Sequence, residues 1–158
     1  MTVVFTALPS DEVRALRSGA SDAYGCPPEV TVSDGPGNPC RHCLRFVREG
    51  RPMLVLAHRP FPVLQPYAET GPIFLCRDDC ARHAGERPAI LDGTPDYLVK
   101  GYSAAHRIVY GTGRIVPTEE IGAYAEAVLK DADVAYIHVR SARNNCYQFR
   151  IDRAPQAR

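Results

Sequence analysis

Short apolar runs bounded by proline and glycine restrict most strongly what this chain can fold into. The runs PMLVLAH (52–58), GPIFLC (71–76) and DYLVKGY (96–102) have the composition and flanking residues that are typical of strands. The segment RPFPVLQPYAET between the first two contains three prolines, which lack the N–H group that a central strand needs. The sequence therefore predicts short strands joined by long loops rich in proline and glycine. Further strands are predicted at residues 2–8, 30–33 and 107–116.

Two helices are predicted between these strands. Ser10 is expected to cap the first helix, which ends near Ser18. The second is expected to run from Thr118 to about Lys130, because Thr118 is followed by two glutamates and then by an amphipathic pattern. Its apolar side chains recur at helical spacing and form one stripe: Ile121, Tyr124, Ala125, Val128 and Leu129.

The last element is predicted to be a β-hairpin over residues 134–151, VAYIHVRSARNNCYQFRI. Apolar and polar residues alternate in both halves, and the apolar face of one strand must match the apolar face of the other. A loop over residues 143–145 satisfies this condition, whereas a two-residue Asn-Asn turn does not. The favoured register pairs Arg140 with Gln148 and His138 with Arg150.

This set of elements favours an α+β fold with a mainly antiparallel sheet, two principal helices and a C-terminal β-hairpin. A chain of 158 residues can bury roughly 70% of its unfolded surface in one core. We therefore expect a single domain over residues 1–158.

Composition narrows the class of partner. The N-terminal residues have no basic region and no long apolar run, so a signal peptide or a membrane span is not expected. We expect a cytoplasmic protein whose six cysteines are thiols available for metal binding or chemistry. The formal net charge of +1 argues against a protein that binds nucleic acid through broad electrostatic attraction.

The cysteines carry the strongest chemical signal. Cys40 and Cys43 are spaced C-x₂-C, which allows one tight turn to supply two ligands to Zn²⁺. The segment LCRDDCARH offers a second pair, in which Cys80 is joined by Cys76 or, alternatively, by His83. The sequence therefore predicts a zinc site at Cys40, Cys43 and Cys80, completed by Cys76 or His83.

Two other interpretations of the cysteines stay open. Reduced thiols are common core residues and need no shared site. Cys40 can instead be a nucleophile or a redox thiol, with His138, His58 or His106 as its base. Cys146 is a poor partner for His138, because the predicted register separates them by roughly 13 Å along the ladder.

Arginines and one tyrosine are candidates for anion binding. A strand arginine must be solvated or face an anion, and two that converge beside His138 would form a pocket for a carboxylate or phosphate group. Tyr67 lies in PYAETGP, a polar stretch of a proline-rich loop of the kind that often carries binding residues. The arginines on predicted strands are Arg107, Arg114, Arg140 and Arg150.

Four segments together resemble one bacterial family. They are NPCRHCLR, QPYAETGPIFLCRDDC, YLVKGYSAAHRIVYGTG and YIHVRSARNNCYQFRI, and the likeness extends from about Val30 to Asp152. The chain is similar in these segments to the family known as domain of unknown function 1203. The resemblance implies no activity, cofactor or catalytic residue.

Two functions from different classes remain. The first is a zinc-stabilised binding module that holds a small anion or a protein partner on an arginine-rich face. The second is a small cysteine-dependent enzyme or redox protein that uses Cys40. A metal-ligating Cys40 would be protected, whereas a working thiol would alkylate quickly near neutral pH.

Overall fold

The computed structural model describes residues 2–155 of the chain. Its elements follow one another along the chain as β1 (Val3–Thr6), α1 (Ser10–Arg17), β2 (Glu29–Val32), β3 (Pro52–His58), β4 (Gly71–Cys76), η1 (Ala89–Gly93), β5 (Asp96–Tyr102), β6 (Arg114–Pro117), η2 (Thr118–Glu120), α2 (Ile121–Val128), β7 (Tyr136–Ser141) and β8 (Tyr147–Arg153). The two η elements are short 3₁₀ turns.

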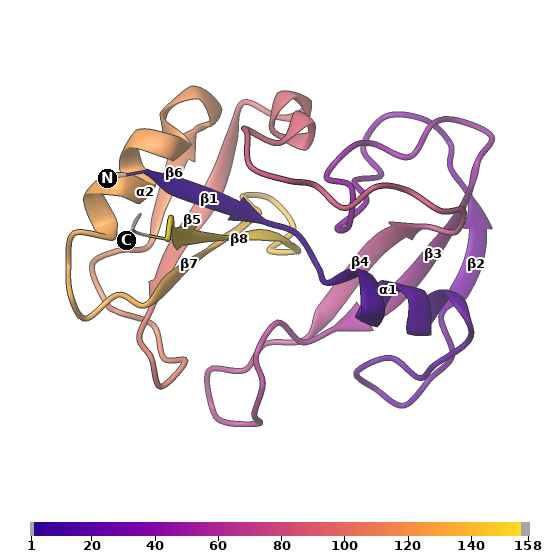
Figure 1. The fold of residues 1–158 in the computed structure, drawn as a ribbon, viewed down its shortest axis with the longest axis horizontal. Helices are drawn as coiled ribbons and strands as arrows, with labels where there is room; N and C mark the ends of the chain where they lie inside the picture. Colours follow the sequence, from indigo (N-terminus) through magenta and orange to yellow (C-terminus); the bar gives the residue numbers. More distant parts are fainter. Residues whose placement is uncertain (1, 156–158) are drawn as a thin grey trace.

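The strands form two antiparallel sheets. A five-stranded sheet has the order β1-β8-β7-β5-β6, and a three-stranded sheet has the order β2-β3-β4. In Figure 1 the larger sheet lies with α2 on one side of the molecule, and the smaller sheet lies with α1 on the other. The expected α+β class, its mainly antiparallel sheet and its C-terminal hairpin of β7 and β8 are confirmed.

Each sheet buries its own apolar cluster. Helix α2 places Ile121, Ala125 and Leu129 against the five-stranded sheet, and all three side chains are fully buried. This confirms the stripe that the helical spacing predicts. Helix α1 packs Val13 and Leu16 into the second cluster, which contains the apolar residues of β3 and β4. The burial of such stripes contributes more to these short helices than their intrinsic propensity does.

The hairpin register is correct in its inner part and wrong toward the loop. His138 pairs with Arg150 as expected, but a bulge follows Val139, and Arg140 pairs with Tyr147 instead of Gln148. The bulge inserts an extra residue into one strand, which the alternation of apolar residues does not reveal. Consequently the Ser141 N–H donates to the Cys146 carbonyl at 2.9 Å, and the loop between β7 and β8 covers residues 142–146.

Residues 107–116 are the clearest error in the predicted strands. Only Arg114–Pro117 is a strand, and the preceding segment turns instead. His106 at φ 62° and Gly111 at φ 94° both occupy the left-handed region, which interrupts a strand. The segment contacts β5 through a bridge between Tyr102 and Ile108 and through the Thr112 hydroxyl, which accepts from the Gly101 N–H at 2.9 Å.

The predicted helix starts are also shifted. Pro9 occupies the N-cap of α1 and Ser10 is its first residue, so the Ser10 hydroxyl does not cap the helix. Thr118 begins the 3₁₀ turn η2, and α2 itself begins at Ile121. Among residues 2–155, neither α-helix has the length and the apolar character that crossing a membrane requires.

Candidate metal centre

A tight turn presents the first two cysteines. The Cys40 N–H donates to the Arg45 carbonyl and the Leu44 N–H donates to the Cys40 carbonyl, both at 2.9 Å. Leu44 has a left-handed backbone at φ 51°, which lets the chain reverse directly after Cys43. The C-x₂-C spacing therefore forms the compact turn that a shared ligand needs.

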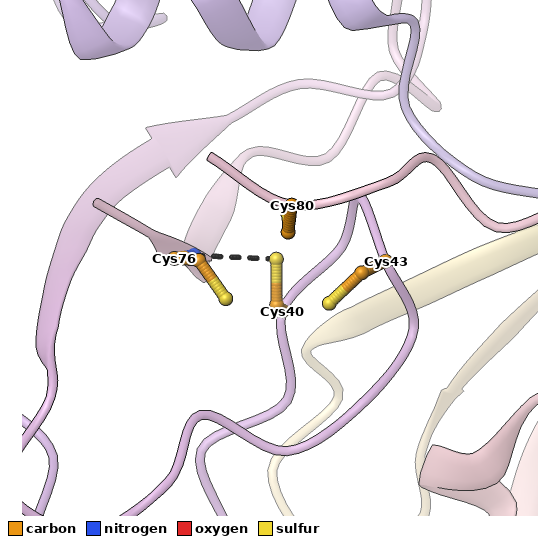
Figure 2. A group of neighbouring side chains, drawn as sticks. All are labelled: Cys40, Cys43, Cys76 and Cys80. Carbon is orange, nitrogen blue, oxygen red and sulfur yellow. Dashed lines mark hydrogen bonds between the residues drawn. The ribbon is translucent and has the colours of Figure 1, made fainter. Parts of the chain in front are cut away.

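Strand β4 supplies the third cysteine and the loop after it supplies the fourth. Cys76 is the last residue of β4, where it pairs with Met53 of β3. The turn at Cys40 lies against the same strand, because Cys40 forms a parallel bridge with Phe74. This contact brings Cys40 beside Cys76 although the two are far apart in the sequence, and the chain then bends so that Cys80 returns to the group (Figure 2).

The four sulfurs form one compact group. All four Sγ atoms lie within 4.8 Å of one another, and Figure 2 shows the four cysteine side chains gathered in one place. A tetrahedral Zn²⁺ with Zn–S bonds of about 2.3 Å separates its sulfurs by about 3.8 Å, so small side-chain adjustments are sufficient. Cys40 is buried, and the side chains of Cys43, Cys76 and Cys80 are half-buried. The arrangement fits a closed four-sulfur metal site.

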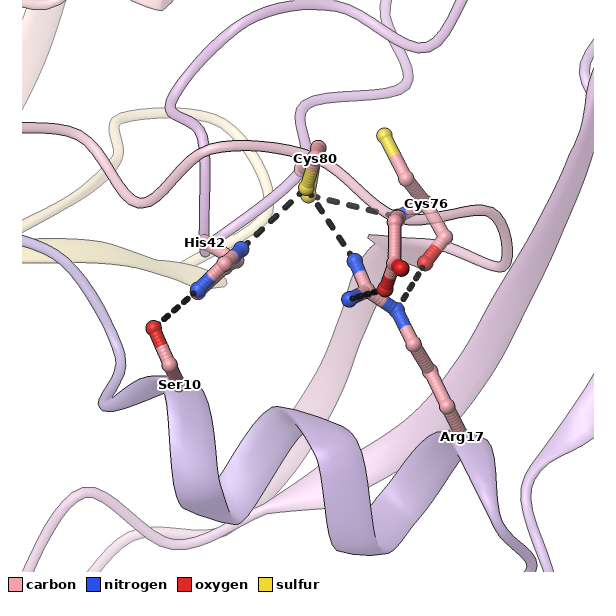
Figure 3. Close-up of polar contacts among 7 residues, drawn as sticks. Ser10, Arg17, His42, Cys76 and Cys80 are labelled. Atoms are coloured by element: carbon pink, nitrogen blue, oxygen red, sulfur yellow. Dashed lines mark hydrogen bonds and ion pairs between the residues drawn. The ribbon is translucent and has the colours of Figure 1, made fainter.

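Nitrogen donors surround these sulfurs. The Cys76 N–H donates to the Cys40 Sγ at 3.2 Å. The Arg17 Nη2 donates to the Cys80 Sγ at 3.1 Å, and the His42 Nδ1 lies 3.2 Å from the same sulfur. The other ring nitrogen of His42 lies 2.9 Å from the Ser10 Oγ, so α1 contributes two contacts to the site (Figure 3). Donors of this kind stabilise thiolate charge and orient metal ligands.

The four thiols lie close enough to shift one another's pKa in opposite directions. The contact with Cys43 lowers the pKa of Cys40 to about 6. The contact with Cys40 lowers the pKa of Cys80, and His42 lowers it further. Cys43 and Cys76 also lie close to Cys40, and this proximity raises the pKa of each above the ordinary thiol value. A bound metal would displace the protons of those thiols that are still protonated.

His83, the predicted alternative to Cys76, lies outside the sulfur group. Its Nε2 is 2.6 Å from the Glu86 carbonyl oxygen, and its backbone N–H donates to the His42 carbonyl at 2.8 Å. The remaining two cysteines are also separate: Cys26 is exposed, and Cys146 lies in the hairpin loop.

The part of the chain that contains the four clustered cysteines matches a known protein family. The family model described as "Protein of unknown function (DUF1203)" matches residues 37–153 of the 158-residue chain. The chain belongs to the DUF1203 family. The match includes all four clustered cysteines and the C-terminal hairpin, and it brings no assigned activity. No curated protein and no solved structure matches the chain.

In this DUF1203 protein the predicted catalytic pair occupies two different environments. Cys40 belongs to the apolar cluster of the small sheet. His138 is 1% exposed and packs among aromatic rings, with the Tyr102 and Tyr147 centroids 4.7 and 4.9 Å from its own. Within residues 2–155 no hydrogen bond joins the two side chains. A catalytic role for this pair stays a prediction.

The predicted anion-binding residues divide into a surface pair and two arginines near His138. Arg107 and Tyr67 form the surface pair, and the Arg107 guanidinium lies 5.2 Å from the centroid of the Tyr67 ring. Arg150 forms an ion pair with Asp152 at 2.6 Å, whereas Arg140 is 3% exposed and forms an ion pair with Glu69 at 3.1 Å.

Sequence reasoning missed the residues that support the sulfurs. Arg17 reaches Cys80 from the last turn of α1, and no local pattern links the two. His42 lies between the two cysteines of the C-x₂-C pair, which was a usable signal for a residue that contacts the site. Glu69 lies in the polar stretch PYAETGP, and its pairing with Arg140 depends on the tertiary structure.

Proposed function

We propose that this DUF1203 protein is a zinc-stabilised binding module in which Cys40, Cys43, Cys76 and Cys80 hold one structural Zn²⁺. The observation that carries the proposal is the approach of all four Sγ atoms to within 4.8 Å of one another. Four protein ligands complete a tetrahedral shell and leave no position for a substrate or water, which is the pattern of structural zinc sites.

The ligand chemistry supports zinc. Thiolates favour soft or borderline metals over Mg²⁺ and Ca²⁺, and a tetrahedral four-sulfur set is typical of zinc or iron. A Zn²⁺ with four thiolates carries a net charge of −2, and the Arg17 guanidinium supplies a positive charge next to Cys80. The site therefore has both its ligands and part of its charge compensation.

The metal would act as a clamp on an irregular segment. Residues 77–88 form no helix or strand, yet they connect β4 to η1. Through Cys80 the metal would attach this segment to the turn at Cys40, and through Arg17 it would attach both to α1. We infer that folding of the small sheet and its loops depends on the metal, since such binding free energy is folding free energy.

The enzyme alternative requires a reachable Cys40. The Cys40 side chain is 0% exposed, and its sulfur accepts a hydrogen bond from the Cys76 N–H. A reagent or substrate would have to open the cluster before it reached this thiol. The burial therefore favours a ligand role over nucleophilic or redox use.

Elemental analysis of protein purified without a histidine tag tests the proposal. We expect about one zinc per chain, with the four clustered thiols protected until a chelator is added. Replacing one ligand in Cys80→Ser should abolish stoichiometric zinc and lower the unfolding temperature. The matched variant Cys26→Ser, which changes an exposed cysteine, should keep the metal. Metal-free protein in which Cys40 reacts fastest with iodoacetamide would refute the zinc site and support the enzyme alternative.

A further inference from the structure

The guanidinium of Arg140 is only half satisfied. Its Nη1 donates to the Asn145 carbonyl at 3.1 Å and lies 3.1 Å from the Glu69 carboxylate. Its Nε and Nη2 are buried and have no hydrogen-bond partner among residues 2–155. These two nitrogens form one edge of the guanidinium, and their N–H bonds are parallel, which is the geometry that grips a carboxylate with two hydrogen bonds. A buried donor left in this state is costly.

Two histidines near this arginine are incomplete in the same way. The Nε2 of His58 and the Nδ1 of His138 are buried and have no partner within residues 2–155. Their side chains come from β3 of the small sheet and β7 of the large sheet, and the Tyr147 ring packs against both, with centroid distances of 5.4 and 4.9 Å. Unsatisfied polar groups therefore gather where the two sheets meet.

A cavity lies beside these groups. Its volume is about 330 Å³, and it is lined by both sheets and by the hairpin loop, including His58, Arg140 and Tyr147. Pro60 and Pro72 give part of the wall an apolar surface. A second cavity of about 570 Å³, which contains His138, shares His58 and Tyr147 with the first. The volume suits a small organic molecule rather than a bare ion.

The balance of charge favours a single negative charge. Burial by itself would raise the pKa of Glu69, but Arg140, Lys100 and the Asn145 amide outweigh it and hold that pKa below its ordinary value. Glu69 is therefore ionised, and it balances only one of the two cations that it contacts. Arg41, a second buried guanidinium, donates to the carbonyls of Tyr147 and Pro39 and does not line this cavity.

The histidines add hydrogen-bonding capacity without further charge. Burial, followed by the charges of Arg41 and Arg140, lowers the pKa of His58 to about 4. Burial likewise lowers the pKa of His138, with Arg140 and Arg150 as the next contributions. Both rings are neutral near pH 7, so each can offer one N–H group to a ligand oxygen.

We propose that the cavity at Arg140 and His58 binds the carboxylate group of a small organic monoacid, held by the Nε and Nη2 edge of Arg140. A monoanion matches the excess positive charge, whereas a phosphate dianion would leave buried negative charge uncompensated. The inference rests on the proposed role as a binding module and not on its metal. It places the ligand at the junction of the two sheets and not at the surface pair of Arg107 and Tyr67.

Titration of the zinc-loaded protein with sodium benzoate, followed by NMR of the arginine Nε–H signals, tests the site directly. We expect a saturable shift of the Arg140 signal with a Kd of about 1 mM or lower. Benzamide, which has the same shape without the charge, should give no such shift. The absence of saturation below about 10 mM benzoate would refute the site. Tighter binding of inorganic phosphate than of benzoate would refute the carboxylate assignment.

Variants distinguish the effect of the paired Nε and Nη2 donors of Arg140 from the effect of its positive charge alone. Arg140→Lys keeps the positive charge and loses the paired donors, so benzoate affinity should fall by about 10-fold or more. The control Arg107→Lys should stay within about twofold of the original affinity, because Arg107 lies on the surface pair. Zinc content is measured on every sample, so a failure of benzoate binding with zinc retained refutes this site alone. If Arg140→Lys does not fold, His58→Gln and the titration of the unaltered protein decide, and unchanged affinity in His58→Gln counts against the cavity.

Discussion

Arg17 provides a sharp test of how the protein prepares its metal site. Its Nη2 donates to the Cys80 Sγ at 3.1 Å and its Nε donates to the Cys76 carbonyl at 3.0 Å. Its side chain is 12% exposed, whereas its acidic partner Asp79 is fully exposed. Arg17→Met retains an apolar stem of similar length and removes all of the N–H donors, so the change isolates the hydrogen bonds.

The magnitude follows from the three contacts. The ion pair with Asp79 is 3.4 Å long and exposed on the acidic side, so it contributes little. The bond to the Cys76 carbonyl holds the chain but does not touch a ligand sulfur. The bond to the Cys80 sulfur is charge-assisted, and the loss of such an outer contact weakens metal binding by about 10- to 100-fold. This corresponds to about 1.4–2.7 kcal/mol.

Competition with a chromophoric chelator measures the effect as the apparent Kd for Zn²⁺. The matched control is Arg14→Met on the same helix, where the side chain is 71% exposed and pairs with the exposed Asp11. We expect that control to bind zinc within about twofold of the original protein. A folded Arg17→Met protein with unchanged zinc affinity would show that the contact with Cys80 does not support a metal site.

Two further predictions concern stability. His58 has a pKa of about 4 in the folded protein against 6.5 ordinarily. The unfolded chain therefore takes up more protons between these values, and the free energy of unfolding falls as the pH drops through this window, by about 2 kcal/mol between pH 7 and pH 5. Urea unfolding at both pH values should show that His58→Gln loses this part of the decline; an identical decline in both proteins would contradict the assignment. At Gly93 an added Cβ would overlap the partly buried ring of Phe46, so Gly93→Ala should lower the free energy of unfolding by about 1–3 kcal/mol. Gly122→Ala in α2 has open space and should stabilise by about 0.5–1 kcal/mol, and equal effects at the two glycines would refute the packing argument.

Local signals were sufficient for much of the fold. The strands at 52–58, 71–76 and 96–102 have the predicted bounds, because proline and glycine mark their ends in the sequence itself. The stripe of α2 was predictable because helical spacing reports one buried face. The turn segment before β6 was not, since His106 in a left-handed conformation gives no compositional signal.

The same contrast between local signals and tertiary structure applies to the candidate sites. The turn that carries Cys40 and Cys43 was predictable from the sequence, because the C-x₂-C spacing acts within one stretch of backbone. The choice between Cys76 and His83 as the partner of Cys80 required the fold, since β4 must lie beside that turn before the sulfurs can meet. The half-satisfied edge of Arg140 is likewise invisible in the sequence. A hydrogen-bond deficit exists only after two sheets from distant segments have excluded water from the same arginine.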